Sequence, residues 1–271
     1  MDRNLINSTT CDENIINDNT IPLSFKDQET QEPCYPYISI IIPVYNEEKN
    51  IKAVLKRIPN HQKFEIIVVD DGSTDKTVKV VQSIKDSRIK LLKHDKNRGY
   101  GAAILSGVKV SKGDIIITMD SDGQHCPEEI PLLIEPIMNN EADVVIGSRY
   151  LGNCKYKIPF YTKLGEKFIN LCFWILYRKK ILNNQSGFRA FSKKARCLFQ
   201  YTIYNKFAFC TEILFKAAYY NLKIIERGIT VNPRKYGSSY INLIRILISI
   251  SVCILIFGIK RVLILKRRIY K

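Results

Sequence analysis

The stretch IIITMDSDGQH, residues Ile115 to His125, contains the features that decide both the fold and the site. Five apolar or β-branched residues run from Ile115 to Met119, as in a strand that is buried on both faces of a parallel sheet. Asp120 and Asp122 follow at once, and side chains two residues apart share one face of an extended chain. Two carboxylates so close repel each other unless a positive charge lies between them. The stretch therefore predicts a buried strand that ends at a cation site.

A hard divalent cation would join the two carboxylates and keep coordination positions open for the phosphates of a substrate. The alternative is a solvated junction between strand and turn, because Asp-Ser-Asp-Gly is also favourable turn chemistry. We favour the metal site because the pair follows an apolar strand, with Gln124 and three other polar strand ends nearby.

Similar apolar runs alternate with amphipathic helices along the first part of the chain. The runs that predict strands cover residues 37–47, 64–75, 88–95, 114–122 and 142–149. Helical periodicity predicts helices over residues 47–59, 75–85, 101–111 and 127–139. A strand–helix alternation repeated four times is typical of an open, mostly parallel α/β sheet with helices on both faces.

The polar residues of these runs gather beyond the carboxyl ends of the strands, where ligands of such sheets bind. Two adjacent acids that end a buried strand need partners, because an unpaired buried charge is costly. We therefore expect Asp70 and Asp71 to bind a nucleobase or ribose, whereas Asp75 caps the helix that follows. The four strand ends read Pro43-Val44-Tyr45-Asn46-Glu47, Asp70-Asp71-Gly72-Ser73, Asp120-Ser121-Asp122 and Gly147-Ser148-Arg149.

The alternation loosens after residue 150. There the sequence predicts a strongly apolar helix over residues 163–180, a loop with a turn over 183–195, a helix over 211–221, a strand over 223–232 and a basic loop over 233–240. Before it, the loop NRGYGAA (residues 97–103) opens a helix and either binds phosphate or is only a close-packed helix start. This loop follows the third strand, which argues against a dinucleotide-binding loop, because such a loop follows the first.

The net charge of +16 is concentrated in the second half of the chain. Residues 1–37 carry a net charge of −5, residues 38–150 a net charge of 0 and residues 151–271 a net charge of +21. Such a basic half predicts binding of phosphate groups, which could belong to a nucleic acid, an anionic lipid or a phosphorylated substrate. A nucleic acid would explain the charge but not the acidic strand ends, so we expect none. The cations attached to turn motifs are Arg149, Arg189, Arg234 and Lys235.

The two ends of the chain differ in character from the part between them. Residues 1–36 predict a disordered or loosely attached acidic tail, and residues 37–240 the packed domain. In residues 241–271, 14 uncharged residues separate Arg245 from Lys260. As a helix they would be about 21 Å long, which is shorter than the hydrocarbon core of a bilayer, about 30 Å. This pattern favours a membrane-associated helix in the interface over a tilted span or a helix buried against another subunit. The eight cysteines include no C-x-x-C pair and suit a reducing compartment.

Six segments together resemble one known family, the inverting family 2 glycosyltransferases with the GT-A (Rossmann-like) fold. Within that family the chain is most similar to the dolichol- or polyprenol-phosphate mannosyl- and glucosyltransferases, over about residues 38–240. The combination of DSDGQH with SGFRAFS carries this narrower resemblance. The segments are IIPVYNE (residues 41–47), VVDDGSTD (68–75), NRGYGAA (97–103), MDSDGQH (119–125), GSR (147–149) and QSGFRAFS (185–192).

The resemblance implies a role for each matching residue. The residues implied to contact the nucleoside of a sugar donor are Pro43, Tyr45, Glu47 and Asp71. Those implied to hold Mg²⁺ or Mn²⁺ against the donor diphosphate are Asp120, Asp122 and Gln124. Arg149 and Arg189 are implied to face the phosphates of donor and acceptor, while Glu212 matches a motif acid of no derived role. The lysine usual after R-x-Y-G is missing from Ser238-Ser239-Tyr240, and Arg234 or Lys235 would have to replace its charge.

The expected activity is that of a membrane-associated enzyme with a cytoplasmic catalytic domain. It would move mannose or glucose, with inversion, from GDP-mannose or UDP-glucose to a polyprenyl or dolichyl phosphate. An acceptor phosphate is already ionised at neutral pH and needs no general base, so the metal and the arginines would carry the catalysis. Two alternatives stay open, a family 2 enzyme with a glycan or protein acceptor, and a non-catalytic nucleotide-sugar-binding or membrane scaffold protein.

Overall fold

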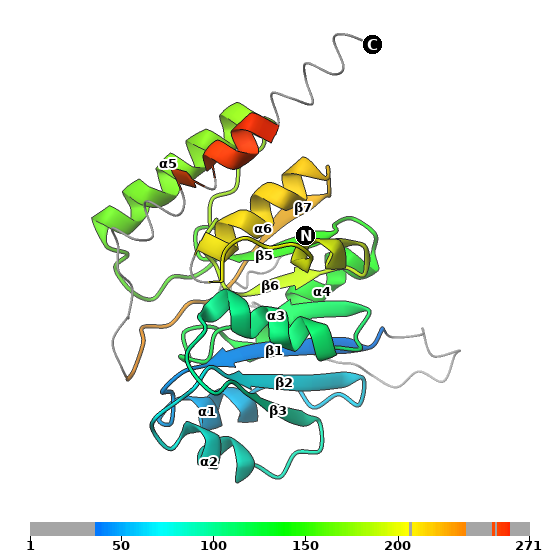
Figure 1. The fold of residues 1–271 in the computed structure, drawn as a ribbon, viewed down its shortest axis with the longest axis vertical. Helices are drawn as coiled ribbons and strands as arrows, with labels where there is room; N and C mark the ends of the chain where they lie inside the picture. The colour runs from blue at the N-terminus through cyan, green and yellow to red at the C-terminus, as the bar shows by residue number, and fades with distance from the viewer. Residues whose placement is uncertain (1–35, 206–207, 237–250, 253, 261–271) are drawn as a thin grey trace, which may run out of the picture. The chain divides into compact units, whose positions relative to one another are not determined.

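A seven-stranded sheet with helices on both faces forms the centre of the computed structural model, which describes residues 36–205, 208–236, 251–252 and 254–260 (Figure 1). The strand order is β3-β2-β1-β4-β6-β5-β7. The strands are β1 (Ile38–Val44), β2 (Phe64–Asp70), β3 (Ile89–Lys93), β4 (Ile115–Thr118), β5 (Val144–Ser148), β6 (Arg189–Phe191) and β7 (Ile224–Gly228). The helices are α1 (Ile51–Lys56), α2 (Thr77–Gln82), α3 (Tyr100–Val110), α4 (Ile130–Met138), α5 (Phe160–Tyr177) and α6 (Ala208–Tyr219), with 3₁₀ turns η1 (Pro127–Glu129) and η2 (Lys194–Phe199).

The long apolar strands form the parallel part of the sheet. β1 pairs in parallel with β2 on one side and with β4 on the other, so that Ile38 lies opposite both Phe64 and Ile115. Every residue of β1, β2, β4 and β5 is buried, which is what a continuous apolar run predicts for strands covered on both faces. The predicted α/β fold with a mostly parallel sheet is therefore confirmed.

Alternate side chains of each strand enter two separate cores. Ile41 and Ile67 pack on the face that α3, α5 and α6 cover, whereas Ile40 and Ile66 pack on the face covered by α1, α2 and α4. The period of two along a strand directs neighbouring residues to opposite faces, so one apolar run supplies both cores. This double burial holds the carboxyl ends of the strands in fixed positions.

β6 is the main departure from the prediction, because residues 183–195 were expected to form a loop with a turn. Residues Arg189–Phe191 instead form a strand that pairs antiparallel with both β4 and β5. A three-residue strand is too short for a recognisable alternation of apolar and polar residues. Its strand character comes from the two neighbours that hold it, with Arg189 opposite Thr118 on one side and Ile146 on the other.

α5 and the helical residues 251–252 and 254–260 run beside each other next to α6 (Figure 1). Phe173 of α5 packs edge-on against Phe215 of α6, with ring centroids 5.2 Å apart, and Phe257 lies 5.9 Å from the same ring. Among the described residues, no helix is long and apolar enough to cross a membrane. The interfacial segment was predicted over residues 241–271, and the structure describes only residues 251–252 and 254–260 of it. The tail was predicted over residues 1–36, and the structure describes only residue 36 of it.

Candidate active site

The loops after β1 and β2 are tied together by hydrogen bonds between side chains and backbone. The Asn46 side-chain oxygen accepts a hydrogen bond from the Thr74 amide at 2.8 Å, and the Asn46 amide donates to the Ser73 hydroxyl at 2.9 Å. Gly72 has a φ of 78°, and a Cβ there would meet the backbone nitrogen of Asn97 at 2.8 Å. Only glycine fits this close approach. The turn that follows β2 thus fixes one side of the site.

Asp71 is buried and holds the turn that opens α3. Its carboxylate accepts hydrogen bonds from the amides of Arg98 at 2.9 Å and Gly99 at 2.7 Å, and lies 2.7 Å from Nδ1 of His94. The other ring nitrogen of His94 lies 2.8 Å from the Ser106 hydroxyl. Asp71 therefore organises the NRGYGAA loop, and its contact with a nucleoside stays a prediction.

Asp70 differs from its neighbour because one of its oxygens has no partner. Oδ2 accepts a hydrogen bond from the Ser73 amide at 3.2 Å, whereas the buried Oδ1 has no hydrogen-bond partner in the described part of the chain. An orphaned buried acceptor at a strand end is what a ligand hydroxyl or amine would satisfy. The predicted contact with a nucleobase or ribose fits Asp70 better than Asp71.

Asp120 lies among polar side chains from three segments, the turn after β4, α3 and β6. Its side chain is 34% exposed, and Nδ1 of His125 lies 3.7 Å from its Oδ2. The Tyr100 hydroxyl donates a hydrogen bond to it from the first residue of α3. Burial raises the pKa of Asp120, the charge of His125 opposes the rise and that of Asp122 adds to it. The carboxylate is thus positioned by its neighbours but is not neutralised by them.

Gly187 gives Asp120 the room it needs. A Cβ at Gly187 would lie far inside van der Waals contact with both carboxylate oxygens of Asp120. The SGFRAFS segment therefore contributes a side of this cradle, since only a residue without a side chain allows the carboxylate to lie there.

Asp122 has partners on its own turn and on the segment after β7. Its Oδ1 accepts a hydrogen bond from the Gln124 amide at 3.0 Å, and its Oδ2 lies 3.8 Å from Nη1 of Arg234. The Gln124 side chain donates to the backbone oxygen of Asn232 at 3.2 Å, which ties the acidic turn to the segment that carries Arg234.

The donor set fits a hard divalent cation. Carboxylate and amide oxygens are the ligands that Mg²⁺ and Mn²⁺ prefer, and Asp122 raises the pKa of Asp120, as expected of two carboxylates that share one small volume. No group of three or more His, Cys, Asp or Glu side chains in the described residues could hold a metal by itself. Asp120, Asp122 and Gln124 would therefore form an open site that needs further oxygens from a ligand.

Arg234 spans the site and pairs with acids on both sides. Nη2 of Arg234 lies 2.5 Å from Oε1 of Glu47, the last residue of the first polar strand end, while Nη1 faces Asp122. Asn50 donates to the other Glu47 oxygen at 2.7 Å. Burial raises the pKa of Glu47, although Asn50 and Arg234 oppose the rise. The basic loop after β7 thus supplies a cation over the acidic strand ends.

Arg149 and Arg189 lie near the site but are bonded to other groups. Arg149 pairs with Glu166 of α5 at 2.5 Å and donates to the Tyr156 hydroxyl at 3.0 Å. Arg189 is 2% exposed and donates to the backbone oxygens of Cys210 at 2.9 Å and Asn184 at 2.8 Å. Its charge lowers the pKa of Asp120, so it acts on that carboxylate from within the sheet. Direct contact of either arginine with a phosphate stays a prediction.

Three further residues from the sequence patterns have clear places. Pro43 is buried in β1 opposite Val69, and Tyr45 follows the strand and is half-buried. Glu212, whose role could not be derived from the sequence, accepts the amides of Ile203 and Tyr204, each at 2.9 Å, and so fixes the loop before α6. Tyr100, His125 and Glu166 were missed as site residues, although Tyr100 follows the Asn-Arg-Gly turn that opens a helix toward the strand ends.

Comparisons with known proteins agree on one family. The family model described as glycosyl transferase family 2 matches residues 39–199. The chain is 34% identical over 219 residues to a UDP-N-acetylglucosamine–dolichyl-phosphate N-acetylglucosaminyltransferase of Methanococcus voltae, covering 74% of this chain and 87% of that protein. It is 36% identical over 211 residues to a dolichol-phosphate mannosyltransferase of Pyrococcus furiosus, covering 74% of this chain and 58% of that protein.

A solved structure shares the fold. Glucosyl-3-phosphoglycerate synthase from Mycobacterium tuberculosis, in complex with Mn²⁺, UDP-glucose and phosphoglyceric acid, superposes with a TM-score of 0.66. The match covers 83% of this chain and 80% of that one at 21% sequence identity. At that identity the likeness supports the architecture alone.

Proposed function

The chain belongs to glycosyl transferase family 2, and we propose that it moves one sugar from a nucleotide sugar to a dolichyl or other polyprenyl phosphate, with inversion, at a membrane. One observation carries the proposal, the pair Asp120 and Asp122 in an open site at the carboxyl edge of the sheet, with Arg234 across from it. The acceptor class is supported by the two relatives, which act on dolichyl or dolichol phosphates.

The donor would bind along the strand ends. Its nucleoside would lie over Pro43, Tyr45 and the orphaned oxygen of Asp70, and its diphosphate over the acidic pair. Mg²⁺ or Mn²⁺ held by Asp120, Asp122 and Gln124 would neutralise charge on the departing diphosphate. Arg234 is the described cation nearest to Asp122 and would leave its two acids for the diphosphate oxygens.

The reaction needs no base from the protein. An ionised oxygen of the acceptor phosphate attacks the anomeric carbon, a new carbon–oxygen bond forms and the bond to the nucleoside diphosphate breaks, whose oxygen takes the electron pair. The residues of the chain position two anions in line and offset their charge. The charge of Arg189 opposes the rise in the pKa of Asp120 that burial causes, and Tyr100 and Gly187 fix the direction of the carboxylate.

The sugar is the open part of this proposal. We expected mannose or glucose, from GDP-mannose or UDP-glucose, and the Methanococcus voltae relative adds N-acetylglucosamine as a third candidate. The proposed transferase domain covers residues 37–240 and faces the cytoplasm, where nucleotide sugars are made, while residues 241–271 contact the membrane.

The test is a transfer assay with the full chain in membranes, radiolabelled UDP- and GDP-sugars, and polyprenyl phosphate. We expect label in the organic phase with Mg²⁺ or Mn²⁺ and none after addition of EDTA. Label found in a water-soluble glycan or in protein would contradict the lipid acceptor and indicate a glycan or protein acceptor instead. Activity that EDTA leaves unchanged would remove the metal from the proposal. Donor binding without turnover, whatever acceptor is offered, would identify a non-catalytic binding protein.

A further inference from the structure

The outer face of α5 is an apolar stripe that solvent reaches. Its residues follow one another at intervals of four, four, three and four, which places them on one side of an α-helix. Each is between 48% and 79% exposed, whereas surface helices usually turn polar residues outward. The stripe consists of Phe160, Leu164, Phe168, Leu171 and Ile175.

The inner face of the same helix is firmly anchored. Ile169, Phe173 and Tyr177 are buried, and Phe173 and Tyr177 pack edge-on against Phe215 at 5.2 Å and 5.9 Å. Glu166, also buried, pairs with Arg149 at the edge of the sheet. α5 is therefore firmly packed on the domain, and the exposure of its apolar outer face does not come from a loosely attached helix.

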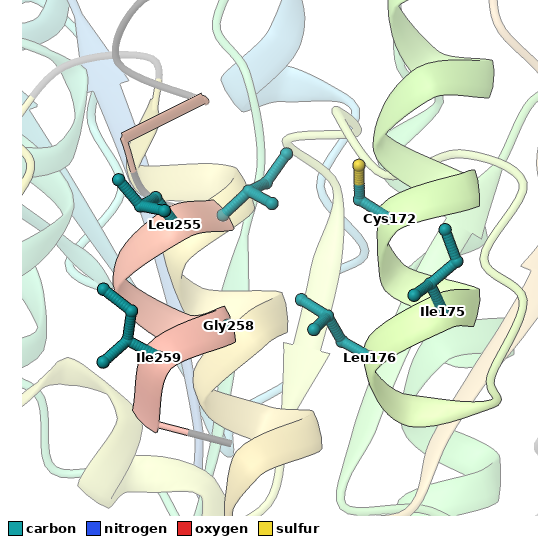
Figure 2. A pocket seen from close by; sticks show the side chains of 7 residues that line it. Cys172, Ile175, Leu176, Leu255, Gly258 and Ile259 are labelled. Atoms are coloured by element: carbon teal, nitrogen blue, oxygen red, sulfur yellow. The ribbon is translucent and has the colours of Figure 1, made fainter. Parts of the chain in front are cut away.

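A groove continues this surface onto the helical residues 254–260 (Figure 2). Residues of α5 and of the other helix line an open space of about 470 Å³, into which Leu176 points from α5. Gly258 forms part of its floor, where it leaves room that a side chain would fill. The lining is almost wholly apolar and consists of Cys172, Ile175, Leu176, Ile254, Leu255, Gly258 and Ile259.

The charges around the stripe select the occupant. The only acid among residues 151–181 is Glu166, which is buried and already paired, and the exposed ionic groups are cations. A second copy of the chain would bring these cations against their equals, whereas anionic lipid head groups would offset them. Trp174 lies beneath the guanidinium of Arg178 at 4.7 Å, and such aromatic and basic pairs are typical of the bilayer interface. The exposed cations are Lys155, Lys157, Lys163, Lys167, Arg178, Lys180 and Lys260.

We propose that α5 and the helical residues 254–260 dock on an anionic bilayer, with the stripe in the acyl boundary and a bilayer hydrocarbon chain in the groove. This inference rests on the proposed function, which requires that the enzyme lies at a membrane. The membrane would then contact not only the C-terminal segment but also a helix that is packed on the catalytic domain. Amphipathic helices with apolar and basic faces bind membranes in this way.

Two hydrogen bonds link the docking helix to Arg189, which lies near the acidic site. The Glu166 backbone oxygen accepts a hydrogen bond from the Asn184 side chain at 3.0 Å, and the Asn184 backbone oxygen accepts one from Arg189 at 2.8 Å. Arg189 in turn acts on Asp120. A bilayer under α5 would therefore keep the carboxyl edge of the sheet at a fixed distance from the head groups, where a lipid phosphate lies.

Trp174 offers a direct test, because it is the single tryptophan of the chain and lies on α5, 40% exposed. The full chain is mixed with vesicles of phosphatidylcholine and phosphatidylglycerol, and tryptophan emission is followed with and without brominated acyl chains. We expect a blue shift and quenching by the brominated lipid, and much weaker effects with phosphatidylcholine alone. Vesicle binding that leaves the Trp174 emission unquenched would overturn the proposal, because another surface would then carry the contact.

Matched variants test the stripe itself. Leu164→Glu and Leu171→Glu should each weaken partition into the mixed vesicles by about tenfold, because a charge replaces an exposed apolar side chain that the bilayer would bury. Met138→Glu is the control, since Met138 is a 40% exposed helical residue on the opposite face of the sheet. Circular dichroism and thermal unfolding show that each variant is folded. Equal partition of all three variants would contradict the proposal.

Two further results separate this inference from the proposed function. Quenching of Trp174 without any sugar transfer would leave the docking surface standing and remove the function. A wild-type dimer in solution that Leu164→Glu dissociates, with no effect of vesicles, would assign the stripe to a second copy and overturn the docking.

Discussion

Acidic side chains lie at both ends of the sheet, and the two groups differ in how their carboxylates are satisfied. At the amino ends of the strands, Glu65 accepts hydrogen bonds from the Ser39 hydroxyl at 2.5 Å, the Lys90 ammonium at 2.6 Å and the Lys112 amide at 2.7 Å. Burial alone would raise the pKa of Glu65, but these bonds outweigh it and lower the pKa. At the carboxyl ends, burial and the neighbouring acid raise the pKa of Asp120.

This difference separates acids that hold the fold from acids that await a ligand. A carboxylate whose hydrogen bonds lower its pKa more than burial raises it stabilises the native state when it is ionised. A carboxylate whose pKa is raised by burial and by a neighbouring acid destabilises the native state when it is ionised, until a cation binds it. The two ends of the same sheet should therefore respond in opposite ways to the loss of a charge.

The strongest test of the comparison is Asp122→Asn. The variant keeps the shape but removes one of the two charges that would hold a divalent cation, so we expect transfer to fall about a thousandfold. The midpoint temperature of thermal unfolding should stay unchanged or rise, because the repulsion between the two carboxylates is relieved. Asp114→Asn serves as control, since Asp114 forms a largely exposed pair with Lys193. An active Asp122→Asn enzyme would contradict the role of the acidic pair.

Gly187→Ala tests the cradle without touching a charge. The added Cβ must displace the Asp120 carboxylate, and a shift of this kind should lower the transfer rate about a hundredfold. Gly165→Ala is the matched control, because a Cβ at Gly165 meets nothing within 4 Å. That control should keep its activity and gain about 0.5–1 kcal/mol of stability, since alanine suits a helix better than glycine. Equal rates for both variants would show that Asp120 tolerates displacement.

Glu65→Gln probes the opposite end of the sheet. A lowered pKa means that the charge of Glu65 stabilises the fold above the pKa of the unfolded chain, and that this stability is lost as the pH falls through the folded value. We expect the variant to lose about 1–3 kcal/mol at neutral pH and nothing in strong acid. Urea unfolding at several pH values measures this, with exposed Glu135→Gln for comparison. A penalty that does not depend on pH would refute the assignment.

The smallest expected effect is that of Tyr100→Phe. The variant removes only the hydroxyl that donates to Asp120, so Mn²⁺ should bind about tenfold more weakly while the fold is kept. Titration of Mn²⁺ by calorimetry gives the affinity, and Tyr220→Phe, at an exposed tyrosine that follows α6, is the control. Unchanged Mn²⁺ affinity would show that Tyr100 is only a packing residue.

The parts of the fold that the sequence predicted are those with local signals. β1, β2, β4 and β5 are long apolar runs because each is buried on both faces, and the acids of the site follow them directly. β6 has no such signal, since its two neighbours make it a strand. These neighbours lie far from it in sequence, so no local pattern could reveal the pairing.

Side-chain partners were the least predictable part of the site. Arg149 and Arg189 carry the charge expected of phosphate-binding residues, but Glu166 and two backbone oxygens take their hydrogen bonds. These partners come from α5, from the segment before β6 and from α6, which meet only in the folded chain. Glu212 shows the reverse case, a motif acid whose task, bonding the amides of Ile203 and Tyr204, is visible only in three dimensions.

β6 also bears on how the chain is made. In the described part of the chain, β4 and β5 do not pair with each other, and Arg189–Phe191 alone joins the β3-β2-β1-β4 half of the sheet to β5 and β7. On the ribosome, the first four strands can assemble as soon as they emerge, but β5 must wait for about forty more residues before its bridging strand appears. We expect nascent chains that stop before residue 189 to expose one edge of β4, and to be the species that chaperones bind.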